Sequence, residues 1–185
     1  MAATPSTMVA LGTTAPAFTL IDVTTGDTIS LASHPGEHAT VIMFICNHCP
    51  YVKHIRQRLV EVANHYQQQG IRFIAISAND AAQYPEDGPE QMKATAKQWG
   101  FSFPYCYDET QEVARAYDAA CTPDFFVYDK QLNLVYRGQF DDARPKNNLP
   151  VTGNDLSAAL DALLTGMPVS PDQKPSIGCN IKWKD

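Results

Sequence analysis

Short apolar runs alternate with amphipathic stretches along the middle of the chain. Residues 39–45 (ATVIMFI) and 71–77 (IRFIAIS) are mostly apolar and rich in β-branched side chains, which is typical of strands buried on both faces. Between them, apolar side chains recur at steps of three and four residues up to Gly70, which predicts an amphipathic helix beginning near Cys49. A strand, a helix and a second strand in this order predict a parallel strand pair with a right-handed crossover.

The rest of the pattern extends this unit into a mixed sheet. Helical periodicity predicts three more helices: residues 89–99, 109–119 and 154–166. Residues 124–128 and 132–138 are separated by a short polar turn, so they predict an antiparallel strand pair. Residues 17–31 predict a β-hairpin about Gly26, in front of the main domain. The expected fold class is therefore α/β, a mixed central sheet flanked by helices, with an N-terminal β-hairpin extension.

Length and composition fit one domain. The chain has 185 residues, of which 44% are hydrophobic, and it can bury a substantial core. We expect a single domain over residues 1–185, with its core over about 12–166. Residues 167–185 contain several prolines and predict an irregular C-terminal tail held by a few apolar side chains.

The charge and the number of cysteines limit which partners and which cellular compartment we expect. The formal net charge of −6 is spread without a polybasic block, so nucleic acid is not an expected partner. The N-terminal residues lack the regions of a signal peptide, and no run approaches the roughly 20 apolar residues of a membrane span. We therefore expect a cytoplasmic protein without a membrane partner. In that reducing compartment, five cysteines favour chemistry or metal binding over structural disulfides.

A pair of cysteines lies where the first buried strand gives way to the helix. The stretch MFICNHCPYV, residues 43–52, favours a redox dithiol, because the N-terminus of a helix stabilises the thiolate that disulfide exchange requires. Inert core thiols and a metal site are the alternatives, although a structural zinc site usually has two separated ligand pairs. The metal alternative would use Cys46, His48 and Cys49, with His54 or Cys179 as a further ligand.

Two segments carry a resemblance to the thioredoxin superfamily: the dithiol, and TPDFFVYD at residues 122–129, where Pro123 opens a strand. With the hairpin and the tail GCNIKW at residues 178–183, the chain resembles a peroxiredoxin-like, AhpC/TSA-related redoxin branch that carries a CNHCP motif. The resemblance implies a thioredoxin-like fold, and the dithiol within that fold favours a thiol-disulfide oxidoreductase that needs no bound cofactor and no metal. Its partners would be protein or small-molecule thiols and disulfides, with a thioredoxin-type protein as candidate reductant.

The resemblance also implies roles for single residues. Cys46, expected at the helix N-terminus, would attack a disulfide, and Cys49, one helical turn further on, would resolve the mixed disulfide. His48 stands where strongly oxidising members carry histidine, so it would stabilise the Cys46 thiolate. Pro123 resembles the cis-proline that faces the dithiol, where the Thr122 backbone would offer hydrogen bonds to an extended substrate chain.

The chain departs from both related patterns. Thioredoxins carry a buried acid six positions before the first cysteine, where this chain has Thr40, so we expect proton transfer in the resolving step either to be slow or to use another group, such as His48 or a water. Peroxiredoxins carry a proline and a hydroxyl residue seven and three positions before their reactive cysteine; for Cys49 these are Ile42 and Cys46. A thiol-dependent peroxidase with antioxidant activity is the alternative enzyme. A metal- or peptide-binding module is the alternative outside enzymes.

Three cysteines lie outside the motif. Cys106 and Cys121 adjoin apolar strands and are expected to be small buried residues. Cys179 lies between apolar residues of the tail. For Cys179 two roles stay open: a packing residue, or a third redox thiol that forms a disulfide with the site.

Overall fold

Five strands form the central sheet of the computed structural model, which describes residues 3–184. Their order in the sheet is β6-β5-β4-β8-β9. The first three run parallel, β8 pairs antiparallel with β4, and β9 pairs antiparallel with β8. Their bounds are β4 (Ala39–Phe44), β5 (Ile71–Ser77), β6 (Tyr105–Tyr107), β8 (Asp124–Asp129) and β9 (Leu134–Gly138). The mixed sheet confirms the predicted α/β class.

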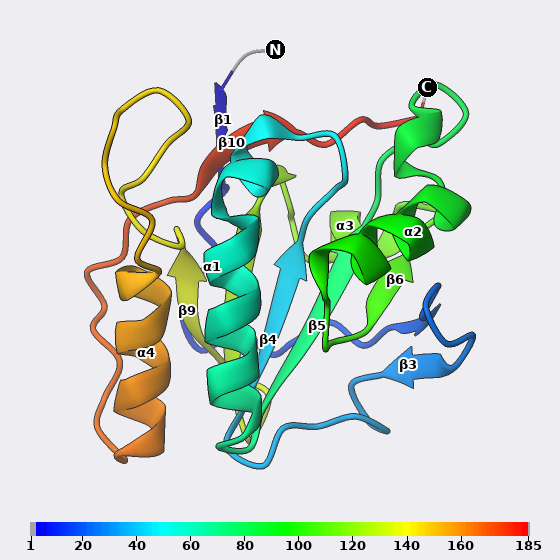
Figure 1. Cartoon of the computed structure of the whole chain (residues 1–185). Helices are drawn as coiled ribbons and strands as arrows, with labels where there is room; N and C mark the ends of the chain where they lie inside the picture. The colour runs from blue at the N-terminus through cyan, green and yellow to red at the C-terminus, as the bar shows by residue number, and fades with distance from the viewer. Residues whose placement is uncertain (1–2, 185) are drawn as a thin grey trace.

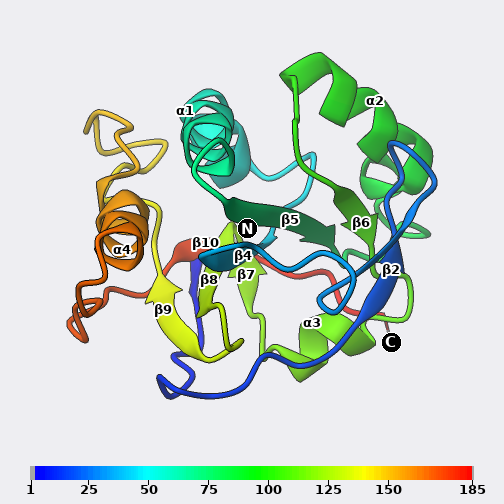
Figure 2. The ribbon, with the colours of Figure 1, turned by 90° about the horizontal axis from the view of Figure 1, so that it is seen from below.

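Helices cover both faces of this sheet. Figure 2 shows α3 on the side of the sheet opposite α1 and α2. The apolar side chains of α1, α2 and α4 share a core with one face of the sheet, while those of α3 share the other core with residues of the N-terminal hairpin. The bounds are α1 (Pro50–Gln67), α2 (Pro89–Trp99), α3 (Glu112–Ala116), α4 (Asn154–Leu164) and, in the hairpin, β2 (Thr19–Ile21) and β3 (Thr28–Ser30).

The apolar run of β4 is explained by its central place. Val41 and Met43 lie in the core shared with α1, whereas Ile42 and Phe44 lie in the core on the α3 side. All four side chains are fully buried, because successive residues of a strand point to opposite faces and both faces are covered. This placement fixes the carboxyl end of β4 in the middle of the molecule, where the cysteine pair follows.

A second, three-stranded sheet joins both ends of the described chain, in the order β1-β10-β7. It consists of β1 (Ala3–Pro5), β7 (Cys121–Thr122) and β10 (Ile177–Asn180). Figure 1 shows β10 and β1 together near the N-terminal end of α1. The prediction of an irregular tail is therefore wrong over Ile177–Asn180, because β10 gains its strand geometry from partners far away in the sequence. Gly178 permits the close approach, since a Cβ atom there would lie 1.9 Å from the carbonyl oxygen of Thr122.

Two predicted elements are shorter than expected. The helix expected over 109–119 is limited to α3, because Gln111 and Asp118 on either side have φ values of 65° and 51°, outside the helical range. The strand expected from 132 begins at Leu134, since Leu132 has a φ of 62° in the preceding turn.

Within residues 3–184, no helix has both the length and the apolar character needed to cross a membrane.

Candidate functional site

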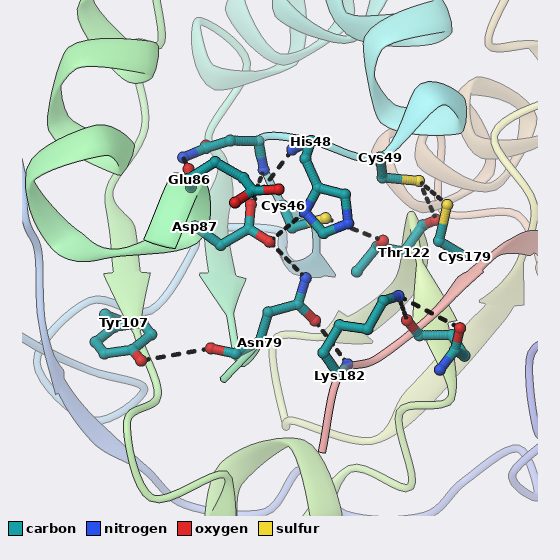
Figure 3. Close-up of polar contacts among 12 residues, drawn as sticks. Cys46, His48, Cys49, Asn79, Glu86, Asp87, Tyr107, Thr122, Cys179 and Lys182 are labelled. Atoms are coloured by element: carbon teal, nitrogen blue, oxygen red, sulfur yellow. Dashed lines mark hydrogen bonds and ion pairs between the residues drawn. The ribbon is translucent and has the colours of Figure 1, made fainter. Parts of the chain in front are cut away.

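The cysteine pair lies where four segments meet: the start of α1, the loop after β5, the step from β7 to β8, and β10 (Figure 3). Helix α1 begins at Pro50, and Cys49 is its N-cap residue in an extended conformation. Proline suits the first turn of a helix, because its missing N–H would have no partner there. Cys46 thus precedes the helix by a full turn, and the expectation that Cys46 occupies the helix N-terminus is wrong. The unpaired amides of α1 act on Cys49 instead.

Both sulfur atoms of the pair contact Thr122. Cys46 Sγ lies 3.4 Å from Thr122 Oγ1, and Cys49 Sγ lies 3.2 Å from the Thr122 carbonyl oxygen. The Thr122–Pro123 peptide bond is cis, as the resemblance implies. The two cysteines are 1% and 0% exposed, so their sulfur atoms become accessible to a substrate only when covering residues move.

The third cysteine brought to the site is Cys179. Its Sγ lies 2.8 Å from Cys49 Sγ, although 130 residues separate them (Figure 3). In β10, Cys179 pairs with Thr122 in antiparallel register. The backbone edge that we expected to receive an extended substrate chain is therefore occupied by the protein's own tail. Cys106 and Cys121 are fully buried, as predicted, and burial raises the pKa of the Cys106 thiol to about 12.

Within this thiol cluster the negative charge is favoured on Cys49. The neighbouring thiols of Cys179 and Cys46, with a smaller contribution from the Val52 backbone amide, lower the pKa of Cys49 against the effect of burial. The neighbouring Cys49 sulfur, followed by burial, raises the pKa of Cys46, and the same two causes raise the pKa of Cys179. The geometry thus stabilises a thiolate on the cysteine expected to resolve, rather than on the one expected to attack.

A buried carboxylate that sequence reasoning missed faces His48. Asp87 ends a short 3₁₀ turn, η1 (Pro85–Asp87), in the loop after β5, and its side chain is fully buried. One of its oxygens lies 2.5 Å from His48 Nδ1, and the other accepts the Asn47 backbone amide at 2.8 Å. Asn79 donates to Asp87 at 2.8 Å. Prolines and several acidic residues make this segment typical of a loop, and no periodicity there indicates which acid turns inward.

Asp87 determines the protonation of the imidazole. An ionised carboxylate only accepts hydrogen bonds, so Nδ1 of His48 donates and Nε2 is left as the acceptor of the neutral ring. His48 Nε2 is buried and has no hydrogen-bond partner among residues 3–184. The hydrogen bond to Asp87 raises the pKa of His48, and the same bond contributes to lowering the pKa of Asp87 against the effect of burial. The ring stacks on Tyr84, with centroids 5.6 Å apart, which holds its plane.

The position expected to carry an acid in thioredoxins has a structural role here. The Thr40 hydroxyl accepts the backbone amide of Gly36 at 3.1 Å, at the start of β4 and away from its carboxyl end. The buried acid of this site is Asp87, which reaches the cysteines from a different segment through His48.

One group of described residues has the composition of a metal site. Ligand atoms of Cys46, His48 and Asp87 lie within 4.8 Å of one another. This differs from the set predicted from the sequence: within residues 3–184 the group includes neither Cys49 nor His54. The Asp87 oxygens and His48 Nδ1 already bond one another or backbone amides, so a metal ion would have to displace these hydrogen bonds.

Comparison with known proteins assigns the family. The AhpC/TSA family matches residues 11–137. The chain belongs to the AhpC/TSA family. The thiol-disulfide oxidoreductase ResA of Geobacillus kaustophilus (strain HTA426) is 28% identical to this chain over 127 residues, covering 69% of this chain and 68% of ResA.

Several solved structures resemble this AhpC/TSA chain over most or all of its length. An uncharacterized conserved protein from Geobacillus kaustophilus is 59% identical with a TM-score of 0.98, covering 100% of this chain and 97% of that protein. A hypothetical protein from Sinorhizobium meliloti 1021 is 50% identical with a TM-score of 0.95, covering 98% of both chains. The thioredoxin domain of a thiol-disulfide oxidoreductase from Bacteroides vulgatus has a TM-score of 0.62 at 18% identity, covering 81% of this chain and 97% of that domain. The predicted thioredoxin-like fold is confirmed.

Proposed function

We propose that the protein is a thiol-disulfide oxidoreductase that works through Cys46 and Cys49. The observation that carries the proposal is that both sulfur atoms contact Thr122, beside the cis peptide bond to Pro123, while the Asp87–His48 pair lies on the other side of Cys46. Membership of a redoxin family and similarity to a thiol-disulfide oxidoreductase support a thioredoxin-like redox function.

In the first step, Cys46 attacks one sulfur of a substrate disulfide. The Cys46 proton passes to the imidazole of His48, since a ring nitrogen of His48 and the Cys46 sulfur lie within 4.8 Å of each other, and Asp87 supplies the compensating negative charge. A new bond forms between Cys46 and the substrate, the substrate S–S bond breaks, and the electron pair leaves on the other substrate sulfur, which takes the proton from His48. The Thr122 hydroxyl stabilises the Cys46 thiolate during this step.

In the second step, the Cys49 thiolate attacks Cys46: the Cys46–Cys49 bond forms, the bond between Cys46 and the substrate breaks, and the substrate leaves as a thiolate that takes a proton from the solvent. The low pKa of Cys49 means that its thiolate is available without a buried acid at the position of Thr40. The products are a Cys46–Cys49 disulfide and two substrate thiols, so two electrons have moved from the protein to the substrate. A dithiol partner reverses both steps and restores the reduced protein.

Reduction of insulin disulfides, with dithiothreitol as electron donor, tests the proposal. We expect activity in the wild type and in Cys106→Ser, whose thiol is buried away from the motif, and loss of most activity in Cys46→Ser and Cys49→Ser. A Cys46→Ser/Cys49→Ser double variant as active as Cys106→Ser would refute the assignment. Elemental analysis of the purified protein provides a separate test: stoichiometric zinc bound through Cys46 would favour a metal-binding module.

The family match favours one second candidate, a thiol-dependent peroxidase. The peroxidase is tested by measuring the consumption of hydrogen peroxide by the reduced protein and then detecting sulfenic acid on Cys46 or Cys49. Peroxide is small and needs less uncovering of the buried sulfurs than a protein disulfide does. Peroxide turnover that exceeds insulin reduction by a large factor would make the peroxidase the principal activity.

A further inference from the structure

The tail of the chain occupies the place where a thioredoxin-like site would receive an extended substrate. β10 pairs with Thr122 and Cys121 on one side and with β1 on the other, so it is held by backbone hydrogen bonds along both edges. Gly178 lies against the Thr122 carbonyl group, too close for any side chain. This contact positions the next residue, Cys179, directly over the dithiol.

Cys49 lies between two possible disulfide partners. Cys179 Sγ is 2.8 Å from Cys49 Sγ, within reach of a covalent bond of about 2.05 Å after a small rotation of the side chains. On the other side is Cys46, whose sulfur contacts the same residue, Thr122, as the Cys49 sulfur does. All three cysteines are at most 1% exposed, so exchange among them is shielded from thiols in solution.

We propose that Cys179 is a third redox thiol, and that Cys49 alternates between a disulfide with Cys46 and a disulfide with Cys179. This inference rests on the proposed function, because a substrate disulfide first oxidises Cys46 and Cys49. Cys179 then attacks Cys49: the Cys49–Cys179 bond forms, the Cys46–Cys49 bond breaks, and the electron pair leaves on Cys46. The proton lost by Cys179 is taken up by Cys46 or by His48, so the step is an isomerisation that needs no further oxidant.

Exchange from the Cys46–Cys49 disulfide to the Cys49–Cys179 disulfide frees the Cys46 thiol. With Cys49 bonded to Cys179, the oxidising equivalents are stored on the tail and Cys46 is again a free thiol next to His48. A second substrate disulfide can then form a mixed disulfide with Cys46, which stays until Cys49 is released. The bond also fastens β10 covalently to the start of α1, so the tail cannot leave the Thr122 edge in this state.

The experiment oxidises the full chain with graded amounts of diamide, blocks free thiols with N-ethylmaleimide and maps disulfides by mass spectrometry after non-reducing digestion. In the wild type we expect both Cys46–Cys49 and Cys49–Cys179 linkages. In Cys46→Ser, four thiols remain of the five, and we expect two of them to be lost to a Cys49–Cys179 linkage. Cys179→Ser and Cys179→Ala should show Cys46–Cys49 alone, and Cys121→Ser should behave as the wild type.

A variant at Gly178 tests whether the position of β10 determines the yield of the Cys49–Cys179 linkage. Gly178→Ala should push β10 from Thr122, and in the Cys46→Ser background it should reduce the yield of Cys49–Cys179 several-fold. A wild type that forms only Cys46–Cys49 at every diamide level would overturn the third-thiol role and leave the proposed function intact, as would a Cys49–Cys121 linkage in Cys46→Ser. Formation of neither linkage in the wild type would contradict both. Should Cys46→Ser not fold, the wild-type map decides alone.

Discussion

The substitution Asp87→Asn tests the architecture of the site most directly. Asp87 is fully buried and accepts hydrogen bonds from His48 Nδ1 at 2.5 Å, Asn79 at 2.8 Å, and the backbone amides of Asn47 and His48 at 2.8 and 3.3 Å. Asparagine has nearly the same shape. Its amide oxygen can keep the two backbone donors, but its NH₂ group then faces the Asn79 NH₂ group and the His48 ring.

The expected loss of stability follows from these contacts. A hydrogen bond to a charged group contributes about 1.5–3 kcal/mol, and a buried donor left without a partner costs about 1–3 kcal/mol. One bond is lost outright, that from Asn79, and the bond to His48 loses its charge, so we expect the free energy of unfolding to fall by about 2–4 kcal/mol. For a chain of this size that corresponds to a decrease in Tm of roughly 5–15 °C.

The pH dependence gives a sharper signature than the magnitude. The folded-state pKa of Asp87 is lowered, so its contribution is present above its unfolded pKa of about 3.9 and is lost as the pH falls through the folded value. The folded-state pKa of His48 is raised, so its contribution is complete below about 6.5 and is lost as the pH rises through the folded value. The difference between wild type and Asp87→Asn should therefore be largest between about pH 4 and 6.5.

Urea denaturation of both proteins at pH 3, 5.5 and 9 measures this difference. The matched control is Asp142→Asn, which removes an exposed carboxylate paired with Lys174 and should change stability little. A loss below about 0.5 kcal/mol at pH 5.5 would refute the reasoning, because a buried charge with these partners cannot be removed at so small a cost. So would a difference that is the same at all three pH values.

Three further predictions follow from the described geometry. His48→Gln, which removes the titratable ring, should lower the reduction potential of the dithiol, measured by equilibrium with glutathione; an unchanged equilibrium constant would contradict a role of the imidazole in stabilising the reduced form. Gly153→Ala should cost about 2–3 kcal/mol in urea denaturation, because its φ is 71° and a Cβ would lie 2.7 Å from the Phe140 ring, whereas Gly166→Ala, with a similar φ and open space, should cost only about 1 kcal/mol. Cys106 should stay unmodified by iodoacetamide at pH 8 in the native protein, since burial raises its pKa to about 12, and modification as fast as in urea would exclude this.

The central sheet could be predicted because its signals are local. β4 and β5 are continuous apolar runs, and an amphipathic helix of suitable length separates them. β1 and β10 carry no such signal: they are three and four residues long, and their pairing depends on chain segments more than 170 residues apart, such as Ala3 and Cys179. Local pattern therefore predicted the sheet and its helices, and it missed the strand that completes the site.

Among the site residues too, those in short sequence motifs could be predicted, and those placed by the fold could not. The Cys46–Cys49 spacing and the proline of TPDFFVYD are short motifs, and the structure brings both segments together. Asp87 lies in a loop, where burial is decided by the fold of the backbone rather than by the residue type. The balance of charge between the two cysteines depends on Cys179, which comes from a distant segment and contacts only Cys49 of the pair, and on the start of α1 at Pro50, which places the helix amides next to Cys49.

Strand β10 pairs with both β1 and β7, so we expect the site to gain its third cysteine late in folding, when β10 docks. Cys46 and Cys49 come together within one strand-helix segment, whereas Cys179 meets Cys49 across 130 residues of chain. Contacts of such long range close a long loop, which costs conformational entropy before the contact can stabilise the fold. A molecule whose sheet is formed but whose tail is undocked therefore holds a dithiol without its third cysteine, and the appearance of the Cys49–Cys179 contact reports that the whole chain has reached its native arrangement.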